Sequence, residues 1–294
     1  MRPSIALITA LAAVGAVLAG CSPLESPTPG PAVTDGPTSV TDVSLTAEVY
    51  RTRSDPARGG VQLSVRNTAA VPITVLHAVL ESPALASVIE RDRTTVIPAG
   101  ATRDLALLLP APQCEGGPTL PEAVLTVALA TGEPVEVRLP TTDRIGQWTA
   151  WHASACFTEA ATAQVDLDVR RAPARDDAAT GAIGAELVAT ARSGGVTLLA
   201  IDDTVLFALL DAPVGAERAS TLALNRPLAI DAETVVPLWL AAARCDPHAV
   251  AEDKQGTLFT VHLELGDSSG TTTVIADDAT RAAFYDAIAE TCGF

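Results

Sequence analysis

The chain has 294 residues and a formal net charge of −16; hydrophobic residues make up 48% of it and aromatic residues only 3%. This hydrophobic content can build ordinary domain cores, which must consist mainly of Val, Leu, Ile and Ala. The acidity argues against nucleic acid as a partner, because phosphate binding needs clustered Lys or Arg and the sequence has no basic run. It also disfavours direct adsorption to anionic lipid headgroups.

The first twenty residues have the layout of an export signal. Arg2 gives a short positive region, Ile5–Leu18 an apolar core and Ala19-Gly20 a pair of small residues. The core is shorter than the roughly 18 residues that a membrane-spanning helix needs. Leu18-Ala19-Gly20-Cys21 resembles the lipobox of bacterial lipoproteins. The resemblance implies removal of residues 1–20, a lipid on Cys21 and attachment to the extracytoplasmic face of the cell membrane. The alternatives are an uncleaved anchor and a soluble secreted form.

Residues 21–42 are predicted to be a tether. They are rich in Pro, Ser, Thr and Gly and contain no basic residue. Such a composition cannot build a core and favours the extended polyproline II conformation. At about 3.1 Å per residue, the tether reaches roughly 65 Å at most. We therefore expect the lipid to be the sole attachment of the folded part, which stands away from the bilayer.

Two β-rich halves follow, 43–157 and 163–294. Their short apolar runs often alternate with polar residues, and a period of two indicates strands with one buried face. The predicted strands of the first half are Val43–Tyr50, Val61–Val65, Ile73–Leu80, Arg103–Leu109, Ala123–Ala130 and Val135–Leu139. Those of the second half are Val165–Val169, Ile183–Ala191, Val196–Ile201, Val205–Leu210, Val235–Leu240, Leu258–Leu265 and Thr271–Ile275. Gly266–Gly270 predicts a hairpin loop that is longer than the tightest ones.

This pattern predicts a mainly β protein with two tandem Ig-like antiparallel β-sandwich domains. The boundary between the domains is expected near Thr158–Thr162. Each domain is expected to end in a short helix. Thr142 or Asp143 should cap the first helix, and Asp277 or Asp278 the second, because an Asp or Thr oxygen can accept the first free backbone N–H groups.

Four cysteines besides Cys21 predict disulfides, because an even number in an exported chain indicates pairing. Four cysteines allow three pairings. In each half an apolar strand precedes one cysteine, two strands follow it, and the terminal helix carries the other. This parallel selects Cys114–Cys156 and Cys245–Cys292. In the chain-entropy model each disulfide contributes about 3 to 4 kcal/mol.

The densest polar run is Arg244–Thr257, which contains Asp246, His248 and Lys254, the single lysine of the chain. Its Cys-Asp-Pro-His-Ala segment resembles a segment of uncharacterised actinobacterial secreted proteins and lipoproteins, which implies a family and no activity. The structural interpretation is a turn begun by Asp246 and Pro247, with Lys254 paired to a carboxylate such as Glu252 or Asp253. The functional interpretation is a recognition loop formed by Asp246, His248 and Lys254. A metal site of Cys245 and His248 is a further alternative.

No residue pattern indicates catalysis. The sequence has no Gly-x-Ser-x-Gly element, no His-Glu-x-x-His zinc motif and no glycine-rich phosphate loop. We predict a protein that is not an enzyme, takes no metal or cofactor, and binds an envelope or membrane protein partner. A solute-binding lipoprotein of a transporter is the alternative, although such proteins have two α/β lobes. An envelope hydrolase is a third possibility.

The lipid assignment is testable by metabolic labelling of cells with palmitate. Label should be incorporated into the wild-type protein and absent from Cys21→Ala, because the thioether to the diacylglycerol needs the cysteine sulfur. Equal labelling of both proteins would contradict the assignment.

Overall fold

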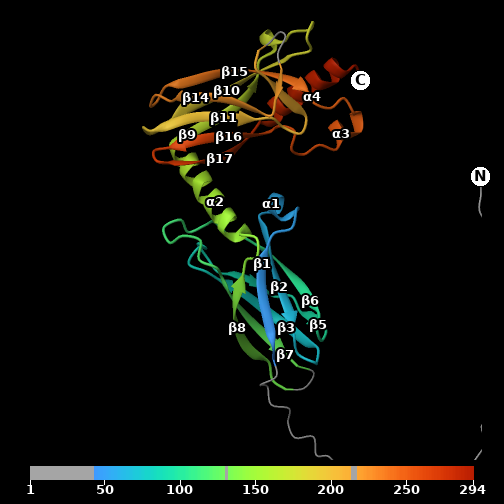
Figure 1. Ribbon diagram of the computed structural model, residues 1–294. Helices are drawn as coiled ribbons and strands as arrows, with labels where there is room; N and C mark the ends of the chain where they lie inside the picture. The colour runs from blue at the N-terminus through green and yellow to red at the C-terminus, as the bar shows by residue number, and fades with distance from the viewer. Residues whose placement is uncertain (1–42, 130–131, 213–216) are drawn as a thin grey trace, which may run out of the picture. The chain divides into compact units, whose positions relative to one another are not determined.

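The computed structural model describes residues 43–129, 132–212 and 217–294 (Figure 1). The signal, Cys21 and the tether lie outside these residues, so their assignments stay predictions. Within the described ranges, no helix combines the length and apolar character needed to cross a membrane. The described residues are mainly β, and their strands form three sheets.

The first half forms one eight-stranded sheet in the order β4-β3-β7-β8-β1-β2-β6, with β5 paired to β3. The short helix α1 (Asp55–Arg58) connects β1 and β2. The strands are β1 (Leu45–Tyr50), β2 (Gly60–Asn67), β3 (Ile73–Glu81), β4 (Ile89–Arg91), β5 (Thr95–Ile97), β6 (Thr102–Leu108), β7 (Glu122–Ala128) and β8 (Val135–Thr142).

The purely antiparallel arrangement that we expected is wrong at one point in this sheet. Strand β8 pairs antiparallel with β7 along Val135–Pro140. Its last residues, Thr141 and Thr142, then pair parallel with Ala47 and Glu48 of β1. Because β8 is long enough to reach both neighbours, it joins the strands of the first half into one continuous sheet.

The second half contains a five-stranded sheet, β13-β12-β15-β10-β9, and a four-stranded sheet, β14-β11-β16-β17. The strands are β9 (Val165–Arg171), β10 (Ile183–Ala191), β11 (Val196–Asp202), β12 (Phe207–Leu210), β13 (Arg218–Ala219), β14 (Thr221–Pro227), β15 (Glu233–Ala242), β16 (Leu258–Leu265) and β17 (Ser268–Ile275). A 3-10 turn, η2 (Pro173–Arg175), follows β9, and helix α3 (Pro247–Ala251) follows β15.

The loop between β16 and β17 is tighter than predicted. Leu265 pairs with Ser268, so the loop itself is only Gly266-Asp267. Gly266 has a φ of 60°, which a glycine adopts without a steric penalty and which a two-residue hairpin loop requires.

Each half has its own hydrophobic core, built mainly from Val, Leu, Ile and Ala as the composition predicts. The second core also contains three fully buried phenylalanines, Phe207, Phe259 and Phe284. The ring of Phe284 lies 5.2 Å from that of Phe207 and 6.0 Å from that of Phe259, measured between centroids. Two of these rings come from strands and one from the C-terminal helix, so they tie that helix to the sheets.

Helix α2 (Gln147–Gln164) is longer than predicted. The carboxylate of Asp143 accepts hydrogen bonds from the backbone N–H groups of Gln147 and Trp148, at 3.0 and 2.8 Å, as expected of a capping residue. The helix does not end at Cys156, and the predicted boundary at 158–162 lies inside it. Residues 157–164 contain three alanines and no Gly or Pro, so nothing in them stops a helix.

Both cores receive a residue of α2. Trp148 is buried in the first core, and Ala161 is buried in the second. The backbone N–H of Arg192 donates to the carbonyl of Gln164, and its guanidinium donates to the carbonyl of Thr162, both at 2.7 Å. A cation at the last free carbonyls of a helix is favourable. The connection between the two halves is therefore a helix fixed at each end.

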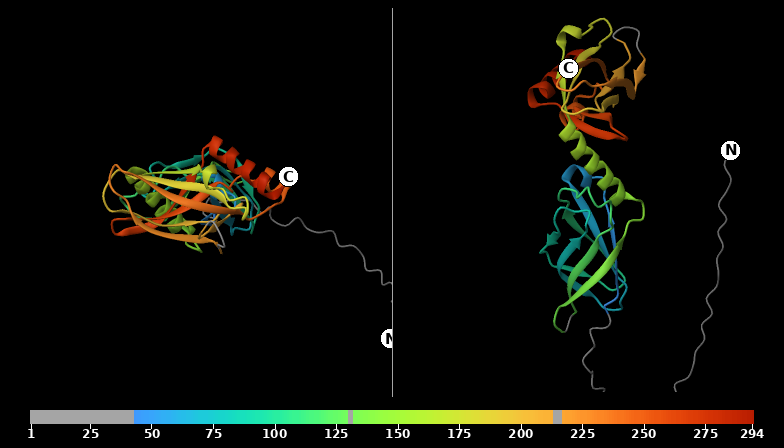
Figure 2. Two further views of the ribbon diagram at one scale, coloured as in Figure 1. Left: turned by 90° about the horizontal axis from the view of Figure 1, so that it is seen from above. Right: turned by 90° about the vertical axis from the view of Figure 1, so that its left-hand side faces the viewer.

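Helix α4 (Asp278–Cys292) closes the second half and lies beside its sheets (Figure 2). Asp277 accepts a hydrogen bond from the backbone N–H of Thr280 at 2.6 Å, which is the predicted N-cap. Phe284 and Ile288 are fully buried on one face of the helix. The spacing of four residues between them explains why a single face of α4 packs on the core.

Asp55, in α1, is an almost completely buried carboxylate with a dense set of hydrogen bonds. The backbone N–H and the hydroxyl of Thr52 each donate to it at 2.7 Å. Gln62 donates at 2.9 Å and Arg58 at 2.7 Å. Burial by itself raises the pKa of Asp55, but these hydrogen bonds outweigh it and lower the pKa to about 2. The charged form of Asp55 therefore stabilises the start of β2.

Replacing Gly270 of β17 by Ala should destabilise the protein by about 1–3 kcal/mol, because an added Cβ would overpack the contact with α2. A Cβ at Gly270 would lie 2.6 Å from the ring of Phe157. Urea unfolding measures the cost. Thr271→Ala, at the exposed neighbouring position, is the control. In a Phe157→Ala background the cost of Gly270→Ala should shrink, and an unchanged cost would contradict the contact.

Asp55→Asn should lower the free energy of unfolding at pH 7 by about 2 kcal/mol, since the folded pKa lies well below the ordinary value. The folded pKa of about 2 is depressed from 3.8, so the stabilisation is complete above pH 4 and is lost as the pH falls toward 2. The variant should consequently lose less stability than the wild type between pH 4 and 2. Urea unfolding across this range tests it, with exposed Asp286→Asn as the control; parallel pH profiles for wild type and Asp55→Asn would refute the role.

Candidate functional site

The predicted recognition loop lies between β15 and β16. The side chain of Asp246 accepts a hydrogen bond from the backbone N–H of His248 at 2.9 Å and is the N-cap of α3. Pro247 occupies the first turn of that helix, where its missing N–H costs nothing. Asp246 therefore has the local structural role that its sequence context indicated, although the segment forms a short helix rather than a simple turn.

The far end of the same loop is fixed to α4. The carboxylate of Asp253 accepts hydrogen bonds from the backbone N–H of Gly256 at 2.6 Å and from the hydroxyl of Tyr285 at 3.1 Å. Burial, together with the charge of Asp253, raises the pKa of Tyr285. The expected ion pair between Lys254 and Glu252 or Asp253 is not formed, because Asp253 is directed to Gly256 and Tyr285 instead.

Cys245 and Cys292 form a disulfide that joins the start of this loop to the end of α4, with a Cα–Cα distance of 5.3 Å. A disulfide sulfur cannot serve as a thiolate ligand, so the alternative metal site of Cys245 and His248 is wrong. Within residues 43–129, 132–212 and 217–294, no cluster of three or more His, Cys, Asp or Glu side chains is arranged to hold a metal ion.

His248 and Lys254 remain exposed while the loop around them is held in place. The disulfide, the Asp246 cap and the Asp253 hydrogen bonds fix the backbone at both ends. Neither side chain forms an ion pair with a described residue. The structure thus presents two nitrogen-bearing side chains on one ordered loop, although it does not bring Asp246 into a polar contact with Lys254.

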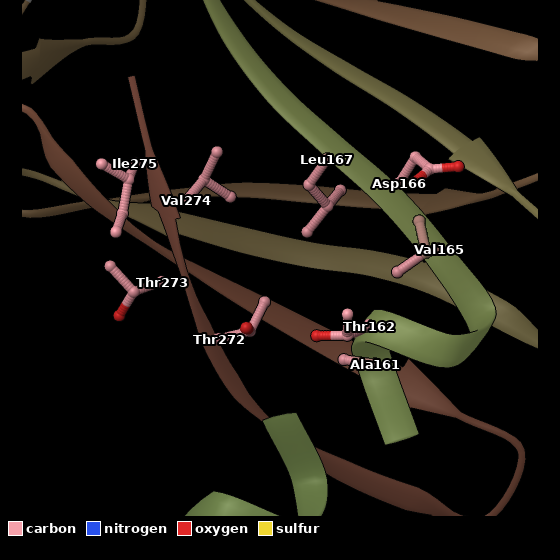
Figure 3. Close-up of a pocket in the computed structure, with 9 residues that line it drawn as sticks. All are labelled: Ala161, Thr162, Val165, Asp166, Leu167, Thr272, Thr273, Val274 and Ile275. Carbon is pink, nitrogen blue, oxygen red and sulfur yellow. The ribbon is translucent and has the colours of Figure 1, made fainter. Parts of the chain in front are cut away.

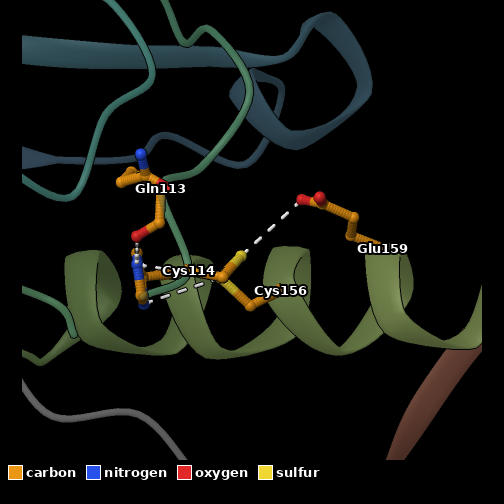
Figure 4. The surroundings of a disulfide bond; sticks show 5 residues. Gln113, Cys114, Cys156 and Glu159 are labelled. Carbon is orange, nitrogen blue, oxygen red and sulfur yellow. Dashed lines mark hydrogen bonds between the residues drawn. A yellow bond between two sulfur atoms is a disulfide. The ribbon is translucent and has the colours of Figure 1, made fainter. Parts of the chain in front are cut away.

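The second disulfide, Cys114–Cys156, joins the segment before β7 to the middle of α2 (Figure 4). These are the two cysteine pairs that the parallel between the halves predicted. Nε2 of His152, a buried residue one turn before Cys156, donates to the carbonyl of Gln113 at 3.0 Å. The carboxylate of Glu159 lies 3.6 Å from the sulfur of Cys114. The disulfide and the histidine together hold the 113–114 segment against the helix.

The two halves share part of their strand pairing. In the first half β2 lies between β1 and β6, and β7 lies between β3 and β8. In the second half β10 lies between β9 and β15, and β16 lies between β11 and β17. The sequence parallel around the cysteines is therefore matched by the topology, and corresponding strands can be compared directly.

A groove separates β9 and β17, the strands that correspond to the paired β1 and β8. Its volume is about 210 Å³. Figure 3 shows Val165 and Leu167 of β9 on one side and Val274 and Ile275 of β17 on the other. Thr162, in the last turn of α2, also lines the groove. Among the residues that the structure describes, these two strands make no ladder with each other, and each has one edge without a strand partner.

Comparisons with known proteins identify no family. No protein-family model matches the chain, and no curated protein matches it. Among solved structures, the YadV chaperone is 11% identical with a TM-score of 0.23, over 79% of this chain and 100% of that one. Red sea bream transglutaminase is 11% identical with a TM-score of 0.21, over 81% and 32% of the two chains. A chain of a chaperone–tip adhesin complex of CFA/I fimbriae is 7% identical with a TM-score of 0.17, over 79% and 100%. Likenesses at such scores carry no argument about function.

Proposed function

We propose that this chain is a lipid-anchored protein on the extracytoplasmic face of the bacterial envelope that binds a partner protein and catalyses no reaction. In this proposal its folded part consists of two tandem Ig-like sandwich domains, 43–157 and 163–294, connected through α2. The two separate cores and the shared pairing order of the halves support this division. The two disulfides are in keeping with an oxidising compartment.

The observation that carries the binding role is the ordered loop that exposes His248 and Lys254. A loop held at both ends loses little conformational entropy when a partner binds, and this preorganisation favours affinity. Lys254 is the single lysine of a chain with a net charge of −16. Its exposed ammonium group, with no ion-pair partner among the described residues, suits a carboxylate on the partner. We therefore place an acidic partner surface at this loop.

The residues that hold the loop differ from those that it exposes. Asp246 and Asp253 hold the backbone, so their removal changes stability. His248 and Lys254 have no such contact, so their removal should leave stability unchanged. The two pairs of residues thus distinguish a structural loop from a recognition loop.

The variant His248→Ala/Lys254→Ala should lose partner capture about tenfold, as expected for one lost charged contact of about 1.4 kcal/mol. Its free energy of unfolding should stay within about 0.5 kcal/mol of the wild type. Asp246→Ala should instead lower stability by about 1 kcal/mol through the lost cap. Quantitative pull-downs from cross-linked cells and urea unfolding provide the two readouts.

Arg226→Ala, which removes an exposed cation on β14, is the matched control for the pull-down. It should retain every protein that the wild type enriches. If the double variant also retains all of them, the loop is structural and the proposed recognition role is wrong.

A further inference from the structure

In the second half, the short strand β12 pairs with β15, the strand that precedes Cys245. Phe207, Ala208, Leu209 and Leu210 pair antiparallel with Ala242, Ala241, Leu240 and Trp239 of β15. All four β12 residues are buried. The edge of β15 is therefore covered by a short apolar strand of the chain itself.

The corresponding ladder of the first half begins and then stops. The backbone N–H of Gln113 donates to the carbonyl of Ala84 at 2.9 Å, and that of Ala86 donates to the carbonyl of Ala111 at 3.0 Å. Ala111 precedes Cys114 by three residues, as Ala242 precedes Cys245, so the segment around Ala86 corresponds to the start of β12. The hydrogen-bonded pairs of the two ladders differ by one residue, because Ala86 bonds Ala111 whereas Leu206 bonds Ala243. Beyond Ala86 the two segments separate, and β4 pairs with β3 while β6 pairs with β2.

The separation leaves a groove of about 440 Å³ between β4 and β6, which we call the β4–β6 groove. This volume is in the range of about 300–1,000 Å³ that is usual for ligand sites. The groove is lined by Ser87–Arg91 on one side and Ala106–Pro110 on the other. Strand β6 has no strand partner along this side among the described residues, so its backbone groups there are open to a new strand.

Apolar side chains mark both walls of the groove. Leu108 on β6 is 70% exposed, and Val88, just before β4, is 51% exposed. The equivalents in the second half are buried by the β12–β15 ladder or lie within it. Proteins usually cover an open strand edge that is apolar and exposed, or place charged residues on it. Among the described residues, no strand pairs with β6 where β12 pairs with β15 in the second half.

Charge at one end of the groove favours a carboxylate on the occupant. Arg91 lines the groove. Burial lowers the pKa of Arg91, and the nearby positive charge of Arg93 lowers it further. Arg91 donates to the carbonyl of Arg93 and to Thr95, at 2.6 and 3.2 Å, rather than to a carboxylate. Neither arginine forms an ion pair with a residue in the described ranges. Glu90 is the single carboxylate among the lining residues.

We propose that the β4–β6 groove binds an extended, apolar segment of a partner protein, which adds to the open edge of β6 as β12 adds to β15. Backbone hydrogen bonds to β6 supply the main attachment, and the side chains of the segment cover Leu108 and Val88. A carboxylate at the Arg91 end of the segment completes the contact. This surface is separate from the His248–Lys254 loop, so either can fail without the other.

The probe is a peptide with the sequence of β12 and its flanks, Leu206–Asp211, labelled at its N-terminus and added to the purified full-length protein. Fluorescence anisotropy should detect saturable binding, and Leu108→Asp should weaken it at least tenfold. Ile145→Asp, at a residue that is 74% exposed outside the groove, should bind as the wild type does. A peptide with Pro in place of Leu210 should not bind, because proline lacks the N–H that the ladder needs there. Leu206 accepts from the backbone N–H of Ala243, so alternate residues, Ala208 and Leu210, face β15 in the ladder that the peptide copies.

Hydrogen–deuterium exchange locates the peptide and keeps the test decisive. Bound peptide should slow exchange of the amides of Ala106 and Leu108 at least fivefold, because Leu109 already donates its N–H to Gly59 and alternate residues of β6 face outward. Absence of binding, equal binding to Leu108→Asp and wild type, or protection confined to β9 and β17 would overturn the proposal. Concentration-dependent dimerisation that Leu108→Asp abolishes would overturn it as well, since a second copy would then be the occupant. Circular dichroism checks that each variant is folded.

Discussion

Hydrogen bonds and a disulfide hold helix α2 at its start, its middle and its end. Each of the two hydrophobic cores contains a residue of this helix. Asp143 binds its first free N–H groups, Cys156 binds it to Cys114, and Arg192 binds its last carbonyls. Trp148 near one end is buried in the first core and Ala161 near the other in the second. A flexible linker at this place would leave each core without one of its packed residues.

Two three-stranded units have the same order in both halves, yet each half leaves open a ladder that the other closes. The first half pairs β1 with β8 and leaves the β4–β6 groove, whereas the second half pairs β12 with β15 and leaves a groove between β9 and β17. Open strand edges expose unpaired backbone groups, which are costly to bury and ready to pair. The β12–β15 ladder of the second half therefore shows how such an edge can be paired.

In the 245–257 loop, some residues hold the backbone in place and their neighbours expose their side chains to solvent. Asp246 and Asp253 use their carboxylates on backbone N–H groups and on Tyr285, whereas His248 and Lys254 are exposed. A charged side chain that has no partner in its own chain gives up no ion pair when it meets a partner's carboxylate. The proposed recognition role rests on these two residues and not on the acidic ones beside them.

The sequence predicted the strongly patterned strands well: Ile183–Ala191 and Leu258–Leu265 have the predicted bounds, because their β-branched and aliphatic runs end at clear turn residues. It also predicted Asp277, one of two candidates, as the N-cap of α4. For α2 the N-cap residue is Gly146, although the candidate Asp143 accepts hydrogen bonds from the first free N–H groups. It missed β4, β5, β13 and β14, since strands of two or three residues and strands with exposed polar residues have too few apolar positions to show a period. It also missed the β4–β6 groove, although Val88 and Leu108 are apolar in the sequence.

What the sequence determined by itself is local: the alternation of buried and exposed residues along each strand, the capping carboxylates, and the matching places of the cysteines in the two halves. Only the tertiary structure decided that β8 reaches β1, that α2 continues past Cys156 into the second core, and that β6 keeps an open edge while β15 does not. These features depend on which segments distant in the chain come side by side, and a period or a cap carries no information about that.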